Sequence, residues 1–95
     1  MKLFIDDERY PVGDNFVTVR SSLEAIEFVK KNGVPTFISF DHDLGGEDTS
    51  MVFINWLIEH MLDNKCKAFD FYVHSQNPIG KKNIEGKLNS FFKML

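Results

Sequence analysis

Cysteine is almost missing from this chain of 95 residues, since Cys66 is the only one. A single cysteine forms no internal disulfide, and no cluster of cysteine and histidine surrounds it that would bind a metal through thiolates. We therefore expect a protein of the reducing cytoplasm, in which Cys66 is a free thiol without a chemical role.

Long apolar runs are missing as well. Asp6 and Asp7 follow directly on the short apolar segment at residues 2–5, which leaves no stretch as long as a signal peptide or a membrane span. Acidic residues outnumber basic ones, so the net charge at pH 7 is -3. The lysines are scattered along the chain and form no basic stripe. The sequence thus predicts neither a membrane partner nor reading of a duplex DNA groove, and a nucleic-acid ligand would be held only locally.

Apolar and aromatic residues, by contrast, are plentiful. Hydrophobic residues make up 43% of the chain and aromatic residues 14%, which is enough for a modest core. There is no internal repeat, linker or low-complexity tract. We expect one domain over residues 1–95, in an oligomeric state that the sequence does not specify.

Strand-like and helical segments alternate along the chain. Apolar or alternating patterns predict strands at residues 2–6, 16–20, 36–41 and 68–74. Helical spacing predicts helices at residues 21–33, from about 49 to 64, and from 78 onward. In the first helix Ser21 and Glu24 have capping-box spacing, and Leu23, Ile26 and Val29 form one stripe. Such alternation predicts parallel pairing with right-handed crossovers, hence a small three-layer α/β domain with a four-stranded parallel sheet.

Polar side chains gather where three of these strands end. In parallel sheets the ligand crevice lies at the carboxyl ends of the strands, so we expect these side chains to meet at one rim. They are Asp6, Asp7 and Arg9 after the first strand, Asp41, His42 and Asp43 after the third, and His74, Ser75, Gln76 and Asn77 after the fourth.

The acidic residues of this rim predict a metal site. Carboxylates on neighbouring strand ends repel one another unless a cation lies among them. Oxygen ligands without a thiolate favour Mg²⁺ or Mn²⁺, and the expected ligands are Asp6, Asp7, Asp41 and Asp43. Asp6 and Asp7 alone would be read as a solvated turn before Pro11; a second acidic cluster on a neighbouring strand end favours the metal.

The histidines of the rim are candidates for proton transfer. His42 and His74 lie at neighbouring strand ends, so one imidazole can act as acid and the other as base on one small ligand. Opening a cyclic phosphodiester requires both of these proton transfers. Either histidine by itself would more simply be a hydrogen-bonded structural group. Arg9 is expected to clamp phosphate oxygens, together with N–H groups at the start of the last helix.

The same residues resemble the receiver fold of response regulators. Asp6 and Asp7 match its acidic pair, Asp41 matches its phospho-accepting aspartate, and Ser75 matches its hydroxyl residue. The chain departs from that family in having no room for a helix between the first two strands and no fifth strand with its lysine. Phosphorylation of Asp41 is therefore expected to be inefficient, unless Lys81 or Lys82 replaces the missing lysine.

A closer resemblance covers nearly the whole chain. The segments LFIDDERYP, VRSSLEAIEF, ISFDHDLGG and VHSQNPIGKKNI are similar to those of cyclic-phosphate processing receiver domains, which are met often in phage and bacterial genomes. The resemblance implies a receiver-like, flavodoxin-like fold that is truncated, and a role in opening cyclic phosphates in RNA repair or nucleotide processing. It also implies the host cytoplasm as location if the protein is phage-encoded.

Two functions from different classes follow. The first is a metal-assisted phosphoesterase acting on a cyclic phosphate, either an RNA end or a cyclic nucleotide. In it the catalytic residues are His42, His74 and Asp41, and the substrate-binding residues are Arg9, Ser75 and Asn77. The alternative is a non-enzymatic receiver-like module that binds a phosphorylated ligand or signals to a partner.

Overall fold

The computed structural model describes all residues of the chain, 1–95, as four strands alternating with three helices. The elements are β1 (Lys2–Ile5), β2 (Phe16–Val19), α1 (Ser22–Asn32), β3 (Phe37–Phe40), α2 (Ser50–Asn64), β4 (Asp70–Val73) and α3 (Pro78–Lys93). Each predicted strand and helix is confirmed, with bounds that differ by a few residues. The Ser21 side chain caps α1 as its sequence pattern predicts, because it accepts a hydrogen bond from the Glu24 N–H.

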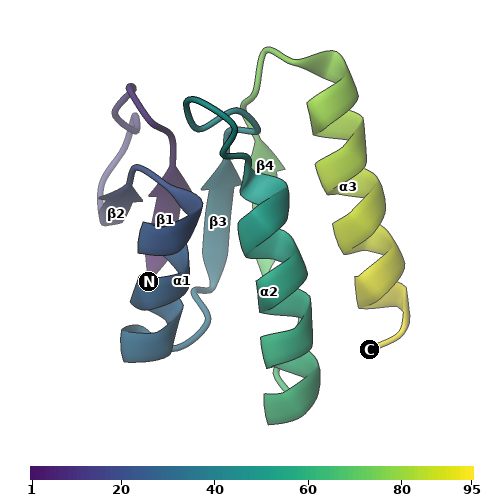
Figure 1. Cartoon of the computed structure of the whole chain (residues 1–95). Coiled ribbons are helices and arrows are strands. Elements are labelled where there is room, and N and C mark those ends of the chain that lie inside the picture. Colours follow the sequence, from purple (N-terminus) through teal and green to yellow (C-terminus); the bar gives the residue numbers. More distant parts are fainter.

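All four strands pair in parallel, in the order β2-β1-β3-β4. Lys2 at the start of β1 pairs with Phe16 on one side and Phe37 on the other, and Phe37 pairs with Asp70. Every strand therefore ends at the same edge of the sheet, at the top of Figure 1. The receiver-like parallel α/β class predicted from the sequence is confirmed.

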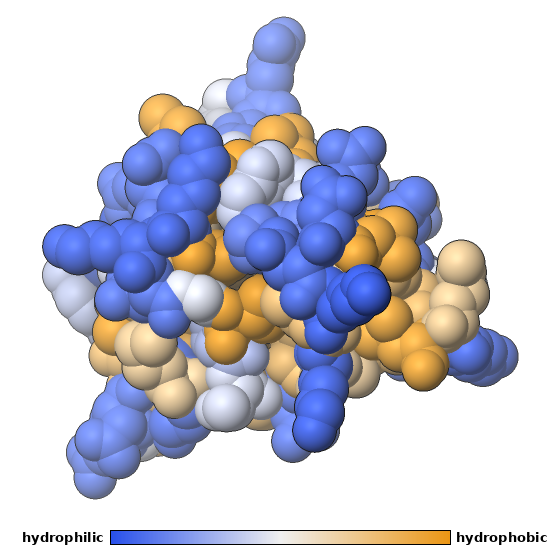
Figure 2. Space-filling view, turned by 90° about the horizontal axis from the view of Figure 1, so that it is seen from below, coloured by the Kyte–Doolittle hydropathy of each residue, from blue (hydrophilic) through white to orange (hydrophobic).

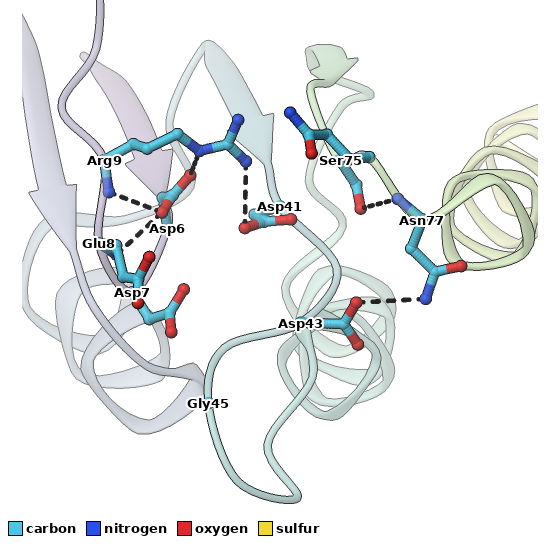
Figure 3. Close-up of a pocket in the computed structure, with 10 residues that line it drawn as sticks. Asp6, Asp7, Glu8, Arg9, Asp41, Asp43, Gly45, Ser75 and Asn77 are labelled. Carbon is cyan, nitrogen blue, oxygen red and sulfur yellow. Dashed lines mark hydrogen bonds and ion pairs between the residues drawn. The ribbon is translucent and has the colours of Figure 1, made fainter.

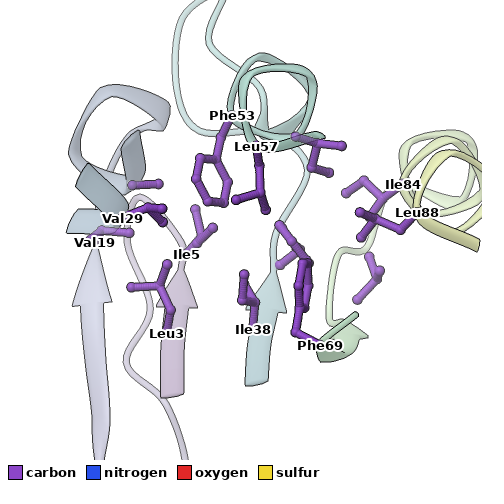
Figure 4. Close-up of a cluster of buried hydrophobic side chains, with 14 of the residues drawn as sticks. Leu3, Ile5, Val19, Val29, Ile38, Phe53, Leu57, Phe69, Ile84 and Leu88 are labelled. Carbon is purple, nitrogen blue, oxygen red and sulfur yellow. The ribbon is translucent and has the colours of Figure 1, made fainter. Parts of the chain in front are cut away.

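In one respect the fold is simpler than the three-layer expectation. Two connections cross the sheet in the same direction: α1 links β2 to β3, and α2 links β3 to β4. Because such crossovers are right-handed, both helices lie on one face of the sheet. The third helix, α3, lies beside α2 on this same face (Figures 1 and 4). Only the step from β1 to β2 runs the other way, and residues 6–15 between them hold no helix. The domain thus has two layers, and the far face of the sheet has no helix over it.

The hydrophobic core lies between the sheet and the helices (Figure 4). Side chains that are at most 2% exposed come from every element except β2, whose Val19 is 6% exposed. One prediction is wrong here: Leu23 is 64% exposed, and Ser22 and Ala25 face the core instead. The Ser22 N–H and hydroxyl both donate to the Asp48 carboxylate, which ties this turn of α1 to the loop after β3.

The end of the molecule where the strands begin carries an apolar hollow of about 640 Å³ between the last turns of α2 and α3. Figure 2 shows this end, with apolar side chains gathered between hydrophilic ones. The apolar residues of the hollow are Met61, Leu62, Cys66, Ala68, Phe92, Met94 and Leu95. None belongs to the predicted site, which lies at the opposite end of the strands. No helix is long and apolar enough to cross a membrane.

Candidate functional site

A polar pocket of about 490 Å³ lies at the edge where the strands end (Figure 3). None of its ten lining residues is hydrophobic. Seven of them are the residues that the sequence assigns to the metal and the substrate: Asp6, Asp7, Arg9, Asp41, Asp43, Ser75 and Asn77. Of the other three, Gln76 was expected at the rim without an assigned role, and Glu8 and Gly45 were not predicted as site residues. Neither His42 nor His74 lines the pocket.

Asp6 is a fully occupied hydrogen-bond acceptor. Its Oδ1 accepts from the N–H groups of Glu8 at 2.9 Å and Arg9 at 2.8 Å. Its Oδ2 accepts from Arg9 Nε at 2.9 Å and contacts His74 Nε2 at 3.0 Å. Burial raises the pKa of Asp6, but these donors outweigh it, so the pKa lies below its usual value. A carboxylate has about four lone-pair sites, so Asp6 would have to give up one of these hydrogen bonds to bind a metal.

Arg9 supplies the positive charge of the pocket. Its guanidinium bridges two carboxylates, through Nε to Asp6 and through Nη2 to Asp41 at 3.3 Å (Figure 3). Burial lowers the pKa of Arg9, but the charges of both aspartates outweigh it and raise the pKa. Arg20 fixes the turn that carries Arg9, because its Nη1 donates to the carbonyl oxygens of Asp6 and Arg9. The Nη1 of Arg9 makes no hydrogen bond within the protein and is left for a ligand.

The remaining acids of the pocket keep free lone pairs. Asp41 accepts the His42 N–H at 2.8 Å besides the weak contact from Arg9. Asp43 contacts His42 Nδ1 at 3.0 Å and accepts from Asn77 Nδ2 at 3.2 Å. These side-chain hydrogen bonds, first that of Asn77 and then that of His42, lower the pKa of Asp43.

Asp7 faces the loop that follows β3 and accepts no hydrogen bond from the protein. Its Oδ2 would lie 3.3 Å from a Cβ added to Gly45, whose φ of 93° is unfavourable for other residues. Glycine at this position lets the loop close against the carboxylate. Asp7 is therefore the least engaged acid of the predicted metal set.

His74 belongs to a hydrogen-bonded chain beside the pocket. Its Nδ1 contacts Ser39 Oγ at 2.7 Å, its Nε2 contacts Asp6, and its ring stacks on Phe4 at 4.6 Å. Burial lowers the pKa of His74 below its usual value, although the hydrogen bond to Asp6 opposes the shift. A neutral ring that donates from Nε2 to the Asp6 carboxylate and accepts the Ser39 hydroxyl satisfies all three groups. The order Ser39–His74–Asp6 is not a nucleophilic triad, since Ser39 is buried outside the pocket.

His42 is held differently. Its Nδ1 contacts Asp43, whereas its Nε2 has no partner in the protein. The ring packs against the first turn of α3, where a Cβ on Gly80 would lie 2.4 Å from the His42 Cγ. The side chain is 13% exposed. A carboxylate on Nδ1 and a free Nε2 leave this imidazole able to exchange a proton at one defined nitrogen.

The segment after β4 is partly committed to capping α3. Asn77 accepts the Gly80 N–H at 3.0 Å while it donates to Asp43, so its side chain shapes the wall of the pocket. Ser75 Oγ accepts the Asn77 N–H at 3.1 Å, which leaves its O–H free to donate to a ligand. The lysines that follow do not replace the lysine of ordinary receivers: Lys81 Nζ lies 5.9 Å from the Tyr72 ring, and neither Lys81 nor Lys82 lines the pocket.

A divalent cation fits the donor chemistry of the pocket, and the four predicted ligands differ in how far their oxygens are already engaged. Ligand atoms of Asp6, Asp41 and His74 lie within 4.8 Å of one another. Both Asp6 and His74 use their acceptor sites in the hydrogen bonds described above. The carboxylates with free lone pairs are those of Asp7, Asp41 and Asp43, an oxygen set of the kind that Mg²⁺ or Mn²⁺ takes.

Comparison with known protein families gives a match over nearly the whole chain. The family model described as Cyclic-phosphate processing Receiver domain matches residues 1–90. No curated protein and no solved structure matches the chain. The matched residues include every residue that lines the pocket.

Proposed function

Because the chain belongs to the family of cyclic-phosphate processing receiver domains, we propose that its rim pocket binds a cyclic phosphate ester and opens it by hydrolysis. In that reaction a water oxygen forms a bond to phosphorus and gives up a proton, the bond from phosphorus to one ring oxygen breaks, and that oxygen takes a proton. The observation that supports the proposal best is a pocket without hydrophobic lining at the carboxyl edge of the sheet, within the matched residues.

Electrostatics decides how an anion enters this pocket. Five carboxylates and one guanidinium line it. A phosphate group would be repelled unless a cation came first or with it. Arg9 can donate from Nη1 to a non-bridging oxygen, and the Ser75 hydroxyl can donate to another.

A divalent ion held by Asp7, Asp41 and Asp43 would supply the further positive charge that the phosphate oxygens need. The protein's own contribution is to keep Arg9 in place. Asp6 does this with a backbone and a side-chain hydrogen bond to Arg9. Asp6 thus acts as the support of the binding residues, not as a metal ligand.

Between the two histidines, His42 is the better proton carrier. Asp43 holds its Nδ1, and no protein group competes for its Nε2. His74 has both ring nitrogens engaged and a lowered pKa, so we assign it to positioning Asp6. The proposal keeps both predicted histidines and gives them different roles.

Turnover of a panel of 2′,3′-cyclic and 3′,5′-cyclic nucleotides, with Mg²⁺, with Mn²⁺ and with a chelator, tests the proposal. His42→Gln is expected to lower kcat by on the order of 10²-fold, as loss of a general acid or base does. His74→Gln is expected to act mainly on KM, through Arg9. Hydrolysis of no member of the panel, or full activity of His42→Gln, would contradict the assignment.

One observation favours the alternative of a phosphate-binding module without turnover: neither histidine lines the pocket. Binding of a cyclic nucleotide with no hydrolysis would select this alternative. Signalling through phosphorylation of Asp41 is a different form of this alternative, and incubation with acetyl phosphate tests it by measuring modification of Asp41. Because no lysine lines the pocket and Asp43 lies beside Asp41, we expect little modification of Asp41.

A further inference from the structure

The sheet face that no helix covers has a defined set of side chains. Leu3 and Ile5 point into the core, so Lys2 and Phe4, which alternate with them, point to the other face. Residues paired with these two across the sheet share that face. From β2 to β4 the first row is Phe16, Lys2, Phe37 and Asp70, and the second row is Thr18, Phe4, Ser39 and Tyr72. We call these eight residues the open face.

Each strand contributes one aromatic ring to the open face. The Phe4 ring is buried among the others and lies 6.0 Å from the Phe16 ring, which lies 6.1 Å from the Phe37 ring. Phe16 and Phe37 are half-buried, and Tyr72 is 59% exposed. A monomer gains little from aromatic rings on an uncovered face, which makes the open face a candidate for contact with a ligand.

Cations accompany the outer rings. Lys2 Nζ lies 4.4 Å from the centre of the Phe16 ring, and Lys81 Nζ reaches from α3 to 5.9 Å from the Tyr72 ring. Asp70 is the one acid of the open face. Aromatic rings interleaved with cations are what single-stranded nucleic acids bind, through stacked bases and neutralised phosphates. The two lysines outnumber this acid, so the charges favour an anionic ligand such as a nucleic acid.

The open face runs into the rim pocket at His74. This residue continues the alternation of β4 onto the same face, where its ring lies parallel to that of Phe4 within 3°. Its Nε2 contacts Asp6, which lines the pocket. Tyr72 precedes His74 by two residues, so its ring lies about 7 Å further down the sheet. The sugar and phosphate of one nucleotide can span that distance.

We propose that the open face is a stacking platform for single-stranded RNA whose terminal cyclic phosphate enters the rim pocket. The last base stacks on Tyr72, the preceding bases stack along Phe37 and Phe16, and Lys81 and Lys2 neutralise their phosphates. The platform makes RNA a better ligand than a free cyclic nucleotide. The placement of the terminal phosphate rests on the proposed function; the stacking does not.

Fluorescence anisotropy with a labelled short oligoadenylate ending in a 2′,3′-cyclic phosphate tests the platform, beside an NMR titration with 2′,3′-cyclic AMP. Wild-type protein should bind the RNA at least about 10-fold tighter than the mononucleotide, the gain expected for a stacked base. Tyr72→Ala should weaken binding of both ligands by about 10-fold, because both carry the terminal base that stacks on Tyr72, and Tyr72→Phe should retain both affinities. Lys81→Ala should weaken RNA binding and its salt dependence, whereas Lys93→Ala, in the last turn of the same helix, should not.

Different results separate the platform from the proposed function. If an oligoadenylate ending in a 3′-hydroxyl binds with the same dependence on Tyr72, while no cyclic phosphate is bound at the rim, the platform stands and the proposed function fails. If the RNA binds no tighter than the mononucleotide, or if Tyr72→Ala leaves RNA binding unchanged, the platform is wrong. A dimer of the protein that Tyr72→Ala dissociates would also overturn it, since the open face would then bind a second copy.

Discussion

At the scale of single residues, the site depends on one saturated carboxylate. Asp6 is 1% exposed and accepts hydrogen bonds from two backbone N–H groups, a guanidinium and an imidazole. Its neighbour Asp7 accepts none from the protein. Adjacent aspartates of the same chemical type thus have opposite tasks, because one is turned into the protein and the other toward the loop at Gly45.

Asp6→Asn is expected to lower the free energy of unfolding by about 2 kcal/mol or more, since an amide cannot accept from all of these donors and hydrogen bonds to charged groups are the strong ones. Asp7→Asn is the matched control and should change stability by less than about 0.5 kcal/mol. Urea denaturation measures both. Equal effects of the two substitutions would refute the supporting role of Asp6.

His74 should make stability depend on pH. Its pKa in the folded protein is lowered from the ordinary 6.5, so the unfolded chain binds the proton more readily. Stability is therefore expected to fall as the pH drops below about 6.5 toward the folded pKa, and to be unaffected by this group above 6.5. His74→Gln should flatten the slope, and His60→Gln on α2 should preserve it. Unfolding curves across this range, with an NMR titration of His74, check the sign; a slope that survives in His74→Gln contradicts it.

At the scale of elements, the start of α3 closes the site from one side. Asn77 caps the helix and donates to Asp43, and the Gly80 backbone packs against the His42 ring. The loop after β3 is tied to α1 through Asp48 in the same way. Two loops that carry candidate site residues are thus each fixed to the start of a helix, which holds their polar side chains in place without disulfides.

Substituting glycines of α3 tests this packing. In Gly80→Ala the new Cβ would lie 2.4 Å from His42 Cγ, so α3 or the imidazole must move, at a cost of about 1–3 kcal/mol. Gly86→Ala is the control on the same helix: nothing lies within 4 Å of its Cβ. It should stabilise the protein by about 0.5–1 kcal/mol. Thermal unfolding and the NMR shifts of His42 report both. A Gly80→Ala protein as stable as Gly86→Ala, with unchanged His42 shifts, would disprove the contact.

At the scale of the whole molecule, the fold concentrates negative charge at one edge. The pocket holds five carboxylates against one guanidinium, although the chain as a whole carries only -3. Their mutual repulsion exists in the folded state and largely vanishes when the chain unfolds. A cation that binds only the folded protein should therefore stabilise it.

Mg²⁺ and Mn²⁺ are expected to raise Tm by roughly 4–8 °C for each kcal/mol of binding free energy in a domain of this size. Asp7→Asn should reduce the increase, because it removes the least engaged carboxylate of the site. Asp63→Asn, at the far end of α2, should leave it unchanged. Differential scanning fluorimetry with both ions and a chelator control measures the shift. Unchanged melting of the wild type in both ions would rule out the metal site.

The sequence by itself determined the elements, the parallel sheet and the edge where the polar residues meet. Hydrophobic period and capping are local properties, and parallel pairing brings all strand ends to one side whatever the packing. Only the tertiary structure decided what each polar atom does. Asp6 and Asp7, or His42 and His74, are equivalent as residue types. The turn at Glu8 and Arg9 together with His74 saturates Asp6, and Ser39 and Asp6 engage both ring nitrogens of His74. The sequence also did not determine which face of the sheet the helices cover. That choice depends on the direction in which each connection crosses the sheet, and in the structure it leaves the open face without a helix.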